Sequence, residues 1–530
     1  MNSGDSINHP ILIIKISNWL NIDNNIFLLS VFLFIISCIF TGSIRVLNLW
    51  LSGVLAAKIT SDISIKAFSK VIFKDYTEHI KNNSSNILNK LSTSVNALTV
   101  VLGYILNIFS SLIIITILFI GLCYVDLFLS LLSIFVFSIT YYLLFSKSRL
   151  FLSRNSALAL KYSESHLKII QEIFGSFRDV IINSNQSFFI KKYKEIDIPL
   201  RYKFAQNRFV QASPRYILEN IGFIFLALLT FILSTKNTNI IPTLGVLALA
   251  AQKILPSMQL IFQGITGFRA NSSQVYDVFD TLSLKNKHRG INLKSKKLIF
   301  KNSIQIKNLY FKYSDKSFNI LDGININLKK GDHLGIIGSS GCGKSTLIDI
   351  FMGLIPPDKG NVFIDNTPLD IKNNYNNLNY WQSIITHVPQ SIFLIDGSIL
   401  ENIAFGIKKE EINLNKVWEV VRLAKIEDYI NSLDNGINTK VGERGIYLSG
   451  GQIQRIGIAR ALYKDAEILI LDEATSALDT ITEKNVISSI SDLKNKMTLI
   501  TITHRLSTLE KCDQIIKLKN GKIVPVKLEK

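Results

Sequence analysis

The stretch GIIGSSGCGKST, residues 335 to 346, decides the fold of the second half of this 530-residue chain. Its residues 338 to 345 match the pattern G-x-x-x-x-G-K-[ST], which describes a loop that wraps a phosphate group. The apolar residues 334 to 337 predict a strand, and residues 344 to 354 predict a helix that the pair Pro356-Pro357 ends. A strand, a glycine-rich loop and a helix in this order predict an α/β domain that binds a nucleotide.

The residue types of this loop suit the phosphates of ATP and a Mg²⁺ ion. The glycines let backbone N–H groups turn inward around phosphate oxygens, and the helix N-terminus adds a positive dipole. Lys344 is expected to reach the β and γ phosphates, and Ser345 to bind Mg²⁺. A plain glycine turn is the alternative, which the strand and helix on either side disfavour. The predicted ATP-binding residues of the loop are Gly338, Ser339, Ser340, Gly341, Cys342, Gly343, Lys344, Ser345 and Thr346.

Two adjacent acidic residues follow an apolar stretch further along the chain. Residues 468 to 473 read ILILDE, which predicts a strand that ends in Asp472 and Glu473. In an enzyme with a P-loop, the first acid holds Mg²⁺ through water and the second polarises the water that attacks the γ phosphate. The alternative is that both acids cap the helix that follows.

The first half of the chain has the composition of a membrane protein. The sequence is 48% hydrophobic and only 19% charged, with a mean hydropathy of +0.28. About 20 apolar helical residues cross a bilayer, so we predict five spans, in the uncharged runs 24–44, 91–125, 127–146, 220–235 and 237–252. Buried helices of a large soluble core are the alternative, mainly for the last two runs.

The distribution of cations predicts how these spans are oriented. The net charge is +19, and Lys and Arg gather in residues 58–90 and 147–215, which we therefore expect in the cytoplasm. Because these cations alternate with spans, nucleic acid is not expected as a partner. The four cysteines show no disulfide or metal-ligand spacing, which fits a reducing cytosol. Residues 1–25 are then outside, which predicts a missing span upstream.

Changes of composition mark the predicted domain boundaries. Residues 1–25 are expected to be an external segment, 26–270 the transmembrane domain, 271–302 a linker and 303–530 the soluble domain. Alternating strand and helix patterns begin after the basic, polar end of the linker. Apolar residues at helical spacing within residues 161–193 predict that the membrane helices extend into the cytoplasm.

A second glycine-containing motif, LSGGQ, precedes an amphipathic helix and consists of Leu448, Ser449, Gly450, Gly451 and Gln452. A Ser-Gly-Gly that opens a helix is another anion-binding N-terminus. In this order the residues resemble the signature of ABC transporters, and the resemblance extends over the whole soluble half and more loosely over the membrane half. It implies an all-α polytopic membrane domain followed by an α/β P-loop NTPase (ABC ATPase) domain. In that family the signature of one domain closes over the ATP held by another, which implies a dimer.

Further residues match the family's pattern one by one. By this resemblance Tyr313 stacks on adenine, and Gln390 binds Mg²⁺ as Ser345 and Asp472 do. Asp479 lies in the loop that crosses the dimer interface, and the catalytic pair is Glu473 and His504. By residue type alone, Tyr313 would be a core residue, Gln390 a turn residue and His504 a structural histidine.

The resemblance implies an exporter-type half-transporter that couples ATP hydrolysis to transport. We expect a homodimer with two complete ATP sites, in the lipid bilayer of a bacterial inner membrane. Its amphiphilic substrate would be a lipid-linked oligosaccharide, a lipid or a hydrophobic compound. The alternative is an ATP-binding membrane subunit with a regulatory or heterodimeric role and no independent transport. Short coupling helices are expected near residues 77–91 and 183–191.

Overall fold

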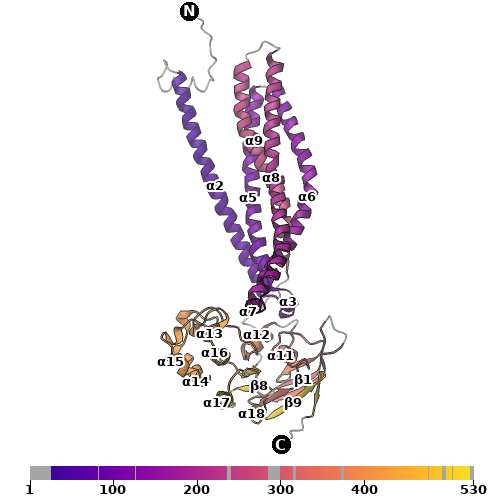
Figure 1. Ribbon diagram of the computed structural model, residues 1–530, viewed down its shortest axis with the longest axis vertical. Helices are drawn as coiled ribbons and strands as arrows, with labels where there is room; N and C mark the ends of the chain where they lie inside the picture. Colours follow the sequence, from indigo (N-terminus) through magenta and orange to yellow (C-terminus); the bar gives the residue numbers. More distant parts are fainter. Residues whose placement is uncertain are drawn as a thin grey trace, which may run out of the picture. The chain divides into compact units, whose positions relative to one another are not determined.

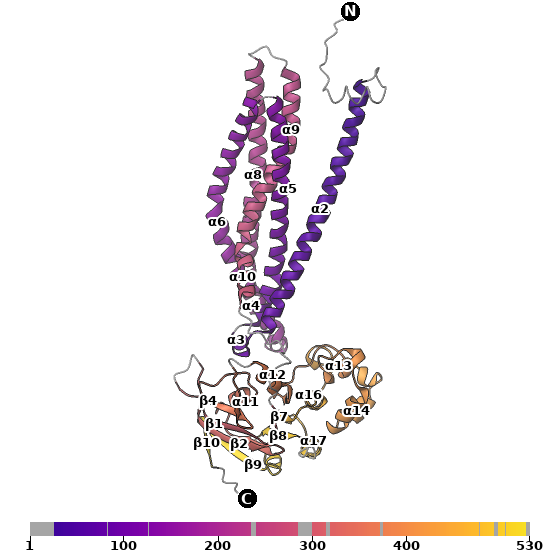
Figure 2. The ribbon, with the colours of Figure 1, turned by 180° about the vertical axis from the view of Figure 1, so that it is seen from behind.

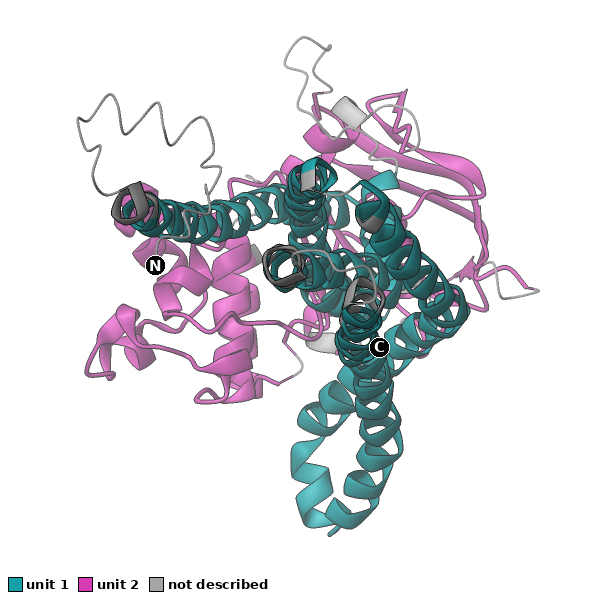
Figure 3. Ribbon diagram, turned by 90° about the horizontal axis from the view of Figure 1, so that it is seen from above, with its two compact units in different colours: residues 1–74, 81–285 teal, residues 75–80, 286–530 magenta. Residues whose placement is uncertain are grey.

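The protein is described by a computed structural model. The structure describes residues 26–81, 83–125, 127–234, 240–284, 299–313, 318–371, 375–475, 477–491, 497–503 and 505–525. The chain divides into two compact units, coloured separately in Figure 3. The first unit comprises Met1–Lys74 and Lys81–Lys285, and the second comprises Asp75–Ile80 and Asn286–Lys530.

The first unit is helical. Its long helices are α2 (Ile26–Ile72), α5 (Val95–Val125), α6 (Leu127–Gly175), α8 (Gln186–Ser234) and α9 (Ile240–Ala270). Helix α5 packs along α9, α6 packs along α8, and α2 leans away from the other four toward its N-terminal end (Figures 1 and 2). The described parts of all five predicted spans are helical.

Three helical stretches in the described part of the chain are long and apolar enough to cross a membrane. They are Val31–Ile72, Ser84–Tyr124 and Ser130–Gly175. Each also continues beyond its apolar part with a polar section, as expected for helices that extend out of a bilayer. For α8 and α9, membrane crossing stays a prediction.

One of the two short helices predicted as coupling helices is not found where it was expected. Instead of a short helix near residues 183–191, the structure has α7 (Phe177–Ile182), and α8 begins already at Gln186. Ser184 between them has a φ of +53°, a left-handed conformation that ends a helix. The first predicted segment, 77–91, instead contains α3 (Tyr76–Lys81), α4 (Ser84–Asn89) and the start of a π-helix, η1 (Lys90–Ser94).

The prediction of a linker over residues 271–302 is wrong for the first part of that range. Residues there form α10 (Ser272–Ser283), which belongs to the first unit. Val275 and Val278 are buried against Val95, Leu98 and Val101 of α5. Their spacing places both valines on one face of a helix, so the segment buries apolar surface and does not remain an extended linker.

The second unit contains two sheets, whose strands are labelled in Figures 1 and 2. The larger has the order β10-β9-β3-β8-β7-β6, parallel except for β10. Its strands are β3 (His333–Ile337), β6 (Ile385–Val388), β7 (Ile468–Asp472), β8 (Thr498–Ile502), β9 (Gln514–Lys519) and β10 (Lys522–Val524). The central strands β3, β7 and β8 are mostly apolar and almost entirely buried, as is usual for a parallel sheet covered on both faces.

The smaller sheet is antiparallel, with the order β2-β1-β4-β5. It consists of β1 (Ser303–Phe311), β2 (Leu321–Lys329), β4 (Lys359–Ile364) and β5 (Thr367–Pro368). The helices of this unit are α11 (Lys344–Phe351), α12 (Tyr375–Ser383), α13 (Ile399–Ile403), η2 (Lys409–Glu411), α14 (Leu414–Leu423), α15 (Glu427–Asn431), η3 (Gly436–Asn438), η4 (Glu443–Gly445), α16 (Gly450–Tyr463), α17 (Thr480–Ser491) and α18 (Leu506–Leu509). The prediction of an all-α first part and an α/β second part is confirmed.

Two hydrophobic clusters hold the second unit together. The first lies between the two sheets and α11, and contains the fully buried Trp381. The Trp381 Nε1–H donates to the carbonyl oxygen of Phe351 at 2.7 Å and so ties α12 to the end of α11. The second cluster joins α13, α14, α16 and α17. The P-loop helix and the signature helix α16 therefore belong to different cores of one unit.

Candidate nucleotide-binding site

The P-loop connects the end of β3 to the start of α11 and is built around backbone that only glycine allows. A Cβ atom at Gly338 would lie 2.4 Å from the backbone oxygen of Leu518 and 2.7 Å from the Sγ of Cys342. The ammonium of Lys344, a residue that is 9% exposed, donates to the carbonyl oxygens of Gly338 at 2.6 Å and Ser339 at 3.2 Å. The loop thus curls around a nearly buried cation.

The start of α11 has the geometry of a phosphate cradle. Gly343 is its N-cap and has a φ of +105°, which a residue with a Cβ rarely adopts. No side chain caps the helix, so its first N–H groups point into the loop. A Cβ at Gly343 would also crowd the backbone oxygen of Ile320 at 3.0 Å. Backbone donors, a helix N-terminus and Lys344 together fit the phosphates of ATP.

The acidic residues predicted from the sequence lie at the same sheet edge as the P-loop. Ile502 of β8 pairs with Ile336 of β3 on one side and with Asp472 of β7 on the other. In parallel sheets, ligands bind at the carboxyl ends of the strands. Burial and the adjacent Glu473 raise the pKa of Asp472, and the Lys344 ammonium counteracts this. A carboxylate in this environment gains from a bound cation, so Asp472 fits the predicted Mg²⁺ role.

Gln390 and Glu473, which are far apart in the sequence, meet in the structure. The Gln390 Nε2–H donates to Oε2 of Glu473 at 2.7 Å. Gln390 follows the end of β6, and Glu473 follows the end of β7, the strand beside it. Glu473 has a φ of +47°, a conformation that costs a non-glycine residue energy and is typical of functional sites. Two residues predicted separately therefore form one hydrogen-bonded pair.

Two residues at this site were missed in the sequence. Asp349 lies one turn after Ser345 on α11, and burial together with the Asp472 carboxylate raises its pKa to about 6. Tyr76 of α3, which belongs to the second unit, has a pKa raised by burial and by the charges of Asp349 and Tyr313. The i, i+4 spacing from Ser345 was a usable signal for Asp349. For Tyr76 the sequence offered none.

Tyr313 follows β1 and is partly buried against the first hydrophobic cluster. Its ring meets that of Phe311 edge to face, with the ring centroids 5.0 Å apart and the planes at 85°. This contact holds the Tyr313 ring at the surface of the core, which is compatible with stacking on an adenine.

The signature residues lie at the start of α16. Ser449 is the N-cap: its Oγ accepts from the Gln452 N–H at 3.3 Å, while Gln452 Oε1 accepts from the Ser449 N–H at 2.7 Å. A Cβ at Gly450 or Gly451 would lie 3.3 to 3.4 Å from atoms of Ala477. Leu448 packs against the second hydrophobic cluster, so in the described part of the chain the signature and the P-loop rest on different cores. The structure does not bring them together within one chain.

The loop after Glu473 is held by side-chain contacts. Asp479 Oδ2 accepts from the Thr482 N–H at 2.9 Å, and this hydrogen bond lowers the pKa of Asp479. The buried Glu483 accepts from the Thr475 hydroxyl at 2.8 Å and pairs with Arg505. His504, the predicted partner of Glu473, lies outside the described residues.

Family models match both parts of the chain. A family model described as "ABC transporter" matches residues 321–476, and one described as "ABC transporter transmembrane region" matches residues 7–258. The structure described as a bacterial Atm1-family ABC exporter with ATP bound superposes with a TM-score of 0.83. It covers 97% of this chain and 90% of that chain at 20% sequence identity, so it shows the shared fold.

Among related sequences, the ATP-dependent lipid A-core flippase of Saccharophagus degradans is 40% identical over 224 residues, which are 42% of this chain and 37% of the flippase. The flippase of the same name from Wigglesworthia glossinidia brevipalpis is 31% identical over 370 residues, 67% of this chain and 61% of the flippase. The heterocyst differentiation ATP-binding protein HepA of a Nostoc species is 36% identical over 275 residues, 51% of this chain and 44% of HepA. The chain thus spans less than two thirds of the length of these relatives.

Proposed function

Because this chain belongs to the ABC transporters, with a transmembrane region and an ATP-binding domain in one polypeptide, we propose that it hydrolyses ATP to export a lipid-type substrate across a bacterial inner membrane. The observation that carries the proposal is the set of groups at the carboxyl ends of β3, β7 and β6. There Lys344, Asp472 and the pair Gln390–Glu473 lie at one edge of the sheet. One chain thus contains residues suited to bind phosphate, to hold Mg²⁺ and to accept a proton from water.

Different residues of the site would bind the phosphates, hold Mg²⁺ and accept the proton during ATP hydrolysis. Lys344 and the N–H groups of α11 bind the β and γ phosphates. Ser345, Asp472 and Gln390 would hold a Mg²⁺ ion, which would neutralise charge between these phosphates. Glu473 accepts a proton from the attacking water, and the hydrogen bond from Gln390 orients its carboxylate toward that task.

We further propose that two copies of the chain assemble as a homodimer. The signature residues on α16 rest on a different core from that of the P-loop, so each signature is available to the ATP of a second chain. The capping box at Ser449 leaves the remaining N–H groups of the first turn of α16 free to bind a phosphate. Since every chain has a P-loop, Glu473 and a signature, both composite sites would be complete.

The proposed cargo is a lipid or lipid-linked compound. Two of the relatives described above are named ATP-dependent lipid A-core flippases. Three described helical stretches of the first unit are apolar enough to lie in a bilayer, where such a cargo is found. The membrane unit and the ATP-binding unit would then act on one substrate in the membrane.

The variant Glu473→Gln tests the catalytic assignment. Glutamine keeps the size of the side chain but accepts a proton poorly, so we expect ATP binding to persist and turnover to fall by a factor of about 100 or more. The measurement is ATPase activity and ATP binding of the full chain in lipid nanodiscs. Glu419→Gln on α14, an exposed position outside the site, is the matched control and should hydrolyse ATP normally. Normal turnover by Glu473→Gln would remove Glu473 from the role of base.

Transport is tested separately in proteoliposomes. A fluorescent lipid should move between leaflets when ATP is added to the wild-type chain, and should not move with Glu473→Gln. ATP hydrolysis without movement of any lipid or hydrophobic probe would favour the regulatory role over export.

A further inference from the structure

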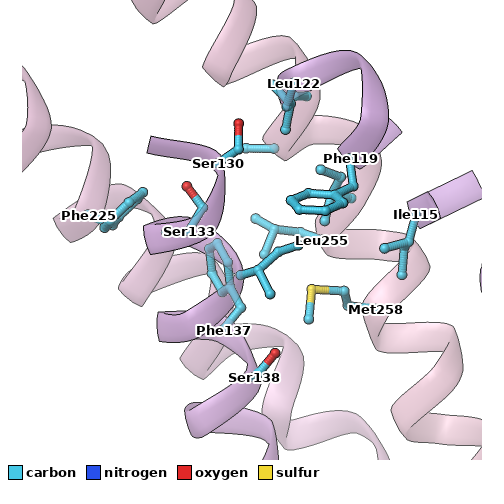
Figure 4. A pocket seen from close by; sticks show the side chains of 15 residues that line it. Ile115, Phe119, Leu122, Ser130, Ser133, Phe137, Ser138, Phe225, Leu255 and Met258 are labelled. Carbon is cyan, nitrogen blue, oxygen red and sulfur yellow. The ribbon is translucent and has the colours of Figure 1, made fainter. Parts of the chain in front are cut away.

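One cavity of the first unit lies among four helices of a single chain. It has a volume of about 150 Å³ and is lined by residues of α5, α6, α8 and α9. Figure 4 shows Phe119, Phe137, Leu255 and Met258 converging on it. Leu122 and Phe137, which both line it, are each 8% exposed. The cavity therefore lies inside the helical unit and is not a groove on its surface.

The sequence of the four helices explains why this space is open. The lining residues of α6 are at positions 130, 133, 134, 137 and 138, and those of α9 are at positions 250, 251, 254, 255 and 258. Spacings of three and four residues place each set on one face of its helix. Small side chains occur on these faces, as serines on α6, alanines on α9 and Gly222 on α8. The few bulky side chains between them do not fill the space.

The cavity offers little to water. Among the described residues that line it, the polar side chains are three serines of α6. Ser130 and Ser133 already have partners, and Ser138 is exposed. A buried water needs two to four polar partners, so water is not expected to occupy the cavity. An apolar cavity that stays empty destabilises a fold, and a bound apolar molecule removes this cost.

Three phenylalanines give the cavity walls that suit an aromatic ring. Phe119 comes from α5, Phe137 from α6 and Phe225 from α8. Phe137 and Phe225 meet edge to face, with ring centroids 6.3 Å apart and planes at 65°. Aromatic rings favour such contacts, and the thioether of Met258 can add a sulfur–aromatic contact. An apolar cavity of about 150 Å³ is large enough for benzene.

The cavity can be reached from one side. Ile115, Ser138 and Met258 line both this cavity and a second one, of about 380 Å³. Ser138 and Ile134, which line the first cavity, are exposed. A small molecule dissolved in the bilayer therefore has a way in between α5, α6 and α9.

We propose that this cavity, the ring pocket, binds one small aromatic group, such as the unsubstituted ring of a hydrophobic compound. A flexible acyl chain has a similar apolar surface, but it loses more conformational freedom on entering a closed space than a rigid ring does. The lining residues belong to one chain, so the site needs no second copy. The proposal goes beyond the proposed function, because neither ATP nor a transported cargo enters the argument.

The test uses 3-phenyl-3H-diazirine, a small aryl photoprobe, on the full chain in nanodiscs without nucleotide. Mass spectrometry of the peptides should show saturable labelling of residues 130–138 and 250–258. Excess iodobenzene should lower this labelling about fivefold or more, because one site binds one ring at a time. Phe34 and Phe40 on α2, each 65% exposed, are the reference for non-specific labelling from the bilayer, which iodobenzene should change little.

A matched pair of variants tests the pocket itself. A Cβ at Gly222 would lie 3.4 Å from Cδ1 of Leu255 and 3.9 Å from Cζ of Phe137, so Gly222→Leu places its side chain in the pocket. Its saturable labelling should fall about fivefold or more, because the added side chain occupies the volume of the ring. Gly121→Leu on α5 is the control, since no atom lies within 4 Å of its Cβ and it does not line the pocket.

A third variant tests the preference for an aromatic ring. Phe119→Leu keeps an apolar side chain but removes one ring, and should lower labelling about threefold, the value of one aromatic pair. A fatty acid with a diazirine in its chain should label the pocket residues no more than it labels α2. Saturable labelling by the fatty acid that exceeds that by the aryl probe would assign the cavity to an acyl chain and refute the proposal.

The competition experiment on the wild-type chain is decisive without any variant. Labelling of residues 130–138 and 250–258 that iodobenzene does not lower would overturn the proposal, as would equal labelling of Gly222→Leu and Gly121→Leu. Because labelling needs no ATP, it should be the same in Glu473→Gln. An ATPase failure with normal labelling would contradict only the proposed transport function. Normal ATPase activity without saturable labelling would contradict only the ring pocket.

Discussion

Replacing Glu483 with Gln is expected to slow ATP turnover without weakening ATP binding. The Glu483 side chain is 2% exposed, accepts from the Thr475 hydroxyl at 2.8 Å and pairs with Arg505. Thr475 follows Glu473 by two residues, and Arg505 directly follows the predicted catalytic His504. Glu483 therefore joins the two backbone segments that carry the predicted catalytic pair.

The size of the effect follows from this geometry. In Glu483→Gln the new side chain would still accept from Thr475, but its neutral amide would not balance the charge of Arg505. A hydrogen bond to a charged group contributes about 1.5 to 3 kcal/mol. The Arg505 side chain is 38% exposed, so water replaces part of this, and we expect a loss of about 1 to 2 kcal/mol. In a domain of this size, that lowers the melting midpoint by roughly 2 to 8 °C.

The assay is ATPase activity of the full chain in nanodiscs as a function of ATP concentration, together with thermal unfolding. We expect kcat to fall about tenfold with little change in KM, because the base is displaced and the P-loop is not. Glu510→Gln, an exposed position, is the control. The double variant with Arg505→Gln should lose less than the sum of the two single variants. A raised KM with normal kcat, or additive losses, would refute the reasoning.

Three further predictions concern the ATP-binding unit. Gly338→Ala places a Cβ 2.4 Å from the backbone oxygen of Leu518 and should abolish binding of a fluorescent ATP analogue. Gly341→Ala is the comparison: no atom lies within 4 Å of its Cβ, so this variant should retain part of the binding. The pKa of Asp349 is raised to about 6, so the stability that its neutral carboxyl contributes is fully present below the unfolded pKa and is lost as pH rises through about 6. Asp349→Asn should therefore raise the melting midpoint at pH 7 and flatten its decline with pH; an unchanged profile would contradict this. Trp381→Phe removes the hydrogen bond to the end of α11 and should cost about 1 to 3 kcal/mol in urea unfolding, and no change would show that this bond is dispensable.

Most of the fold was accessible from the sequence because its signals are local. The P-loop pattern, the apolar strand before Asp472 and the long uncharged runs each depend on consecutive residues. The amphipathic spacing in residues 272–283 is equally local, but the nearby basic and polar stretch led to a prediction of linker there. The short helix α7 ends before the left-handed Ser184, which lies in the run Asn183-Ser184-Asn185; such turn-forming residues were a usable signal for a helix end there.

The sequence named several residues that lie at this sheet edge, but not Asp349 or Tyr76 and not the contacts among them. Gln390 and Glu473 were both named, yet their 2.7 Å hydrogen bond depends on β6 and β7 being neighbours in the sheet. The Glu483 pairs with Thr475 and Arg505 depend in the same way on tertiary packing. Such pairs lie between segments whose relative position only the folded sheet determines, so one sequence could not reveal them.

The left-handed backbone of Glu473 affects which mutations this position would accept during evolution. Glycine at this position would relieve a strain of about 1 kcal/mol or more, and either glutamate codon becomes a glycine codon by changing its middle base. Loss of the proposed base is thus a single mutational step that also removes backbone strain, so Glu473→Gly should melt at a higher temperature than Glu473→Ala, which keeps the strain. Relief of strain alone would favour glycine here, so if Glu473 is the base, selection for turnover is what opposes that step.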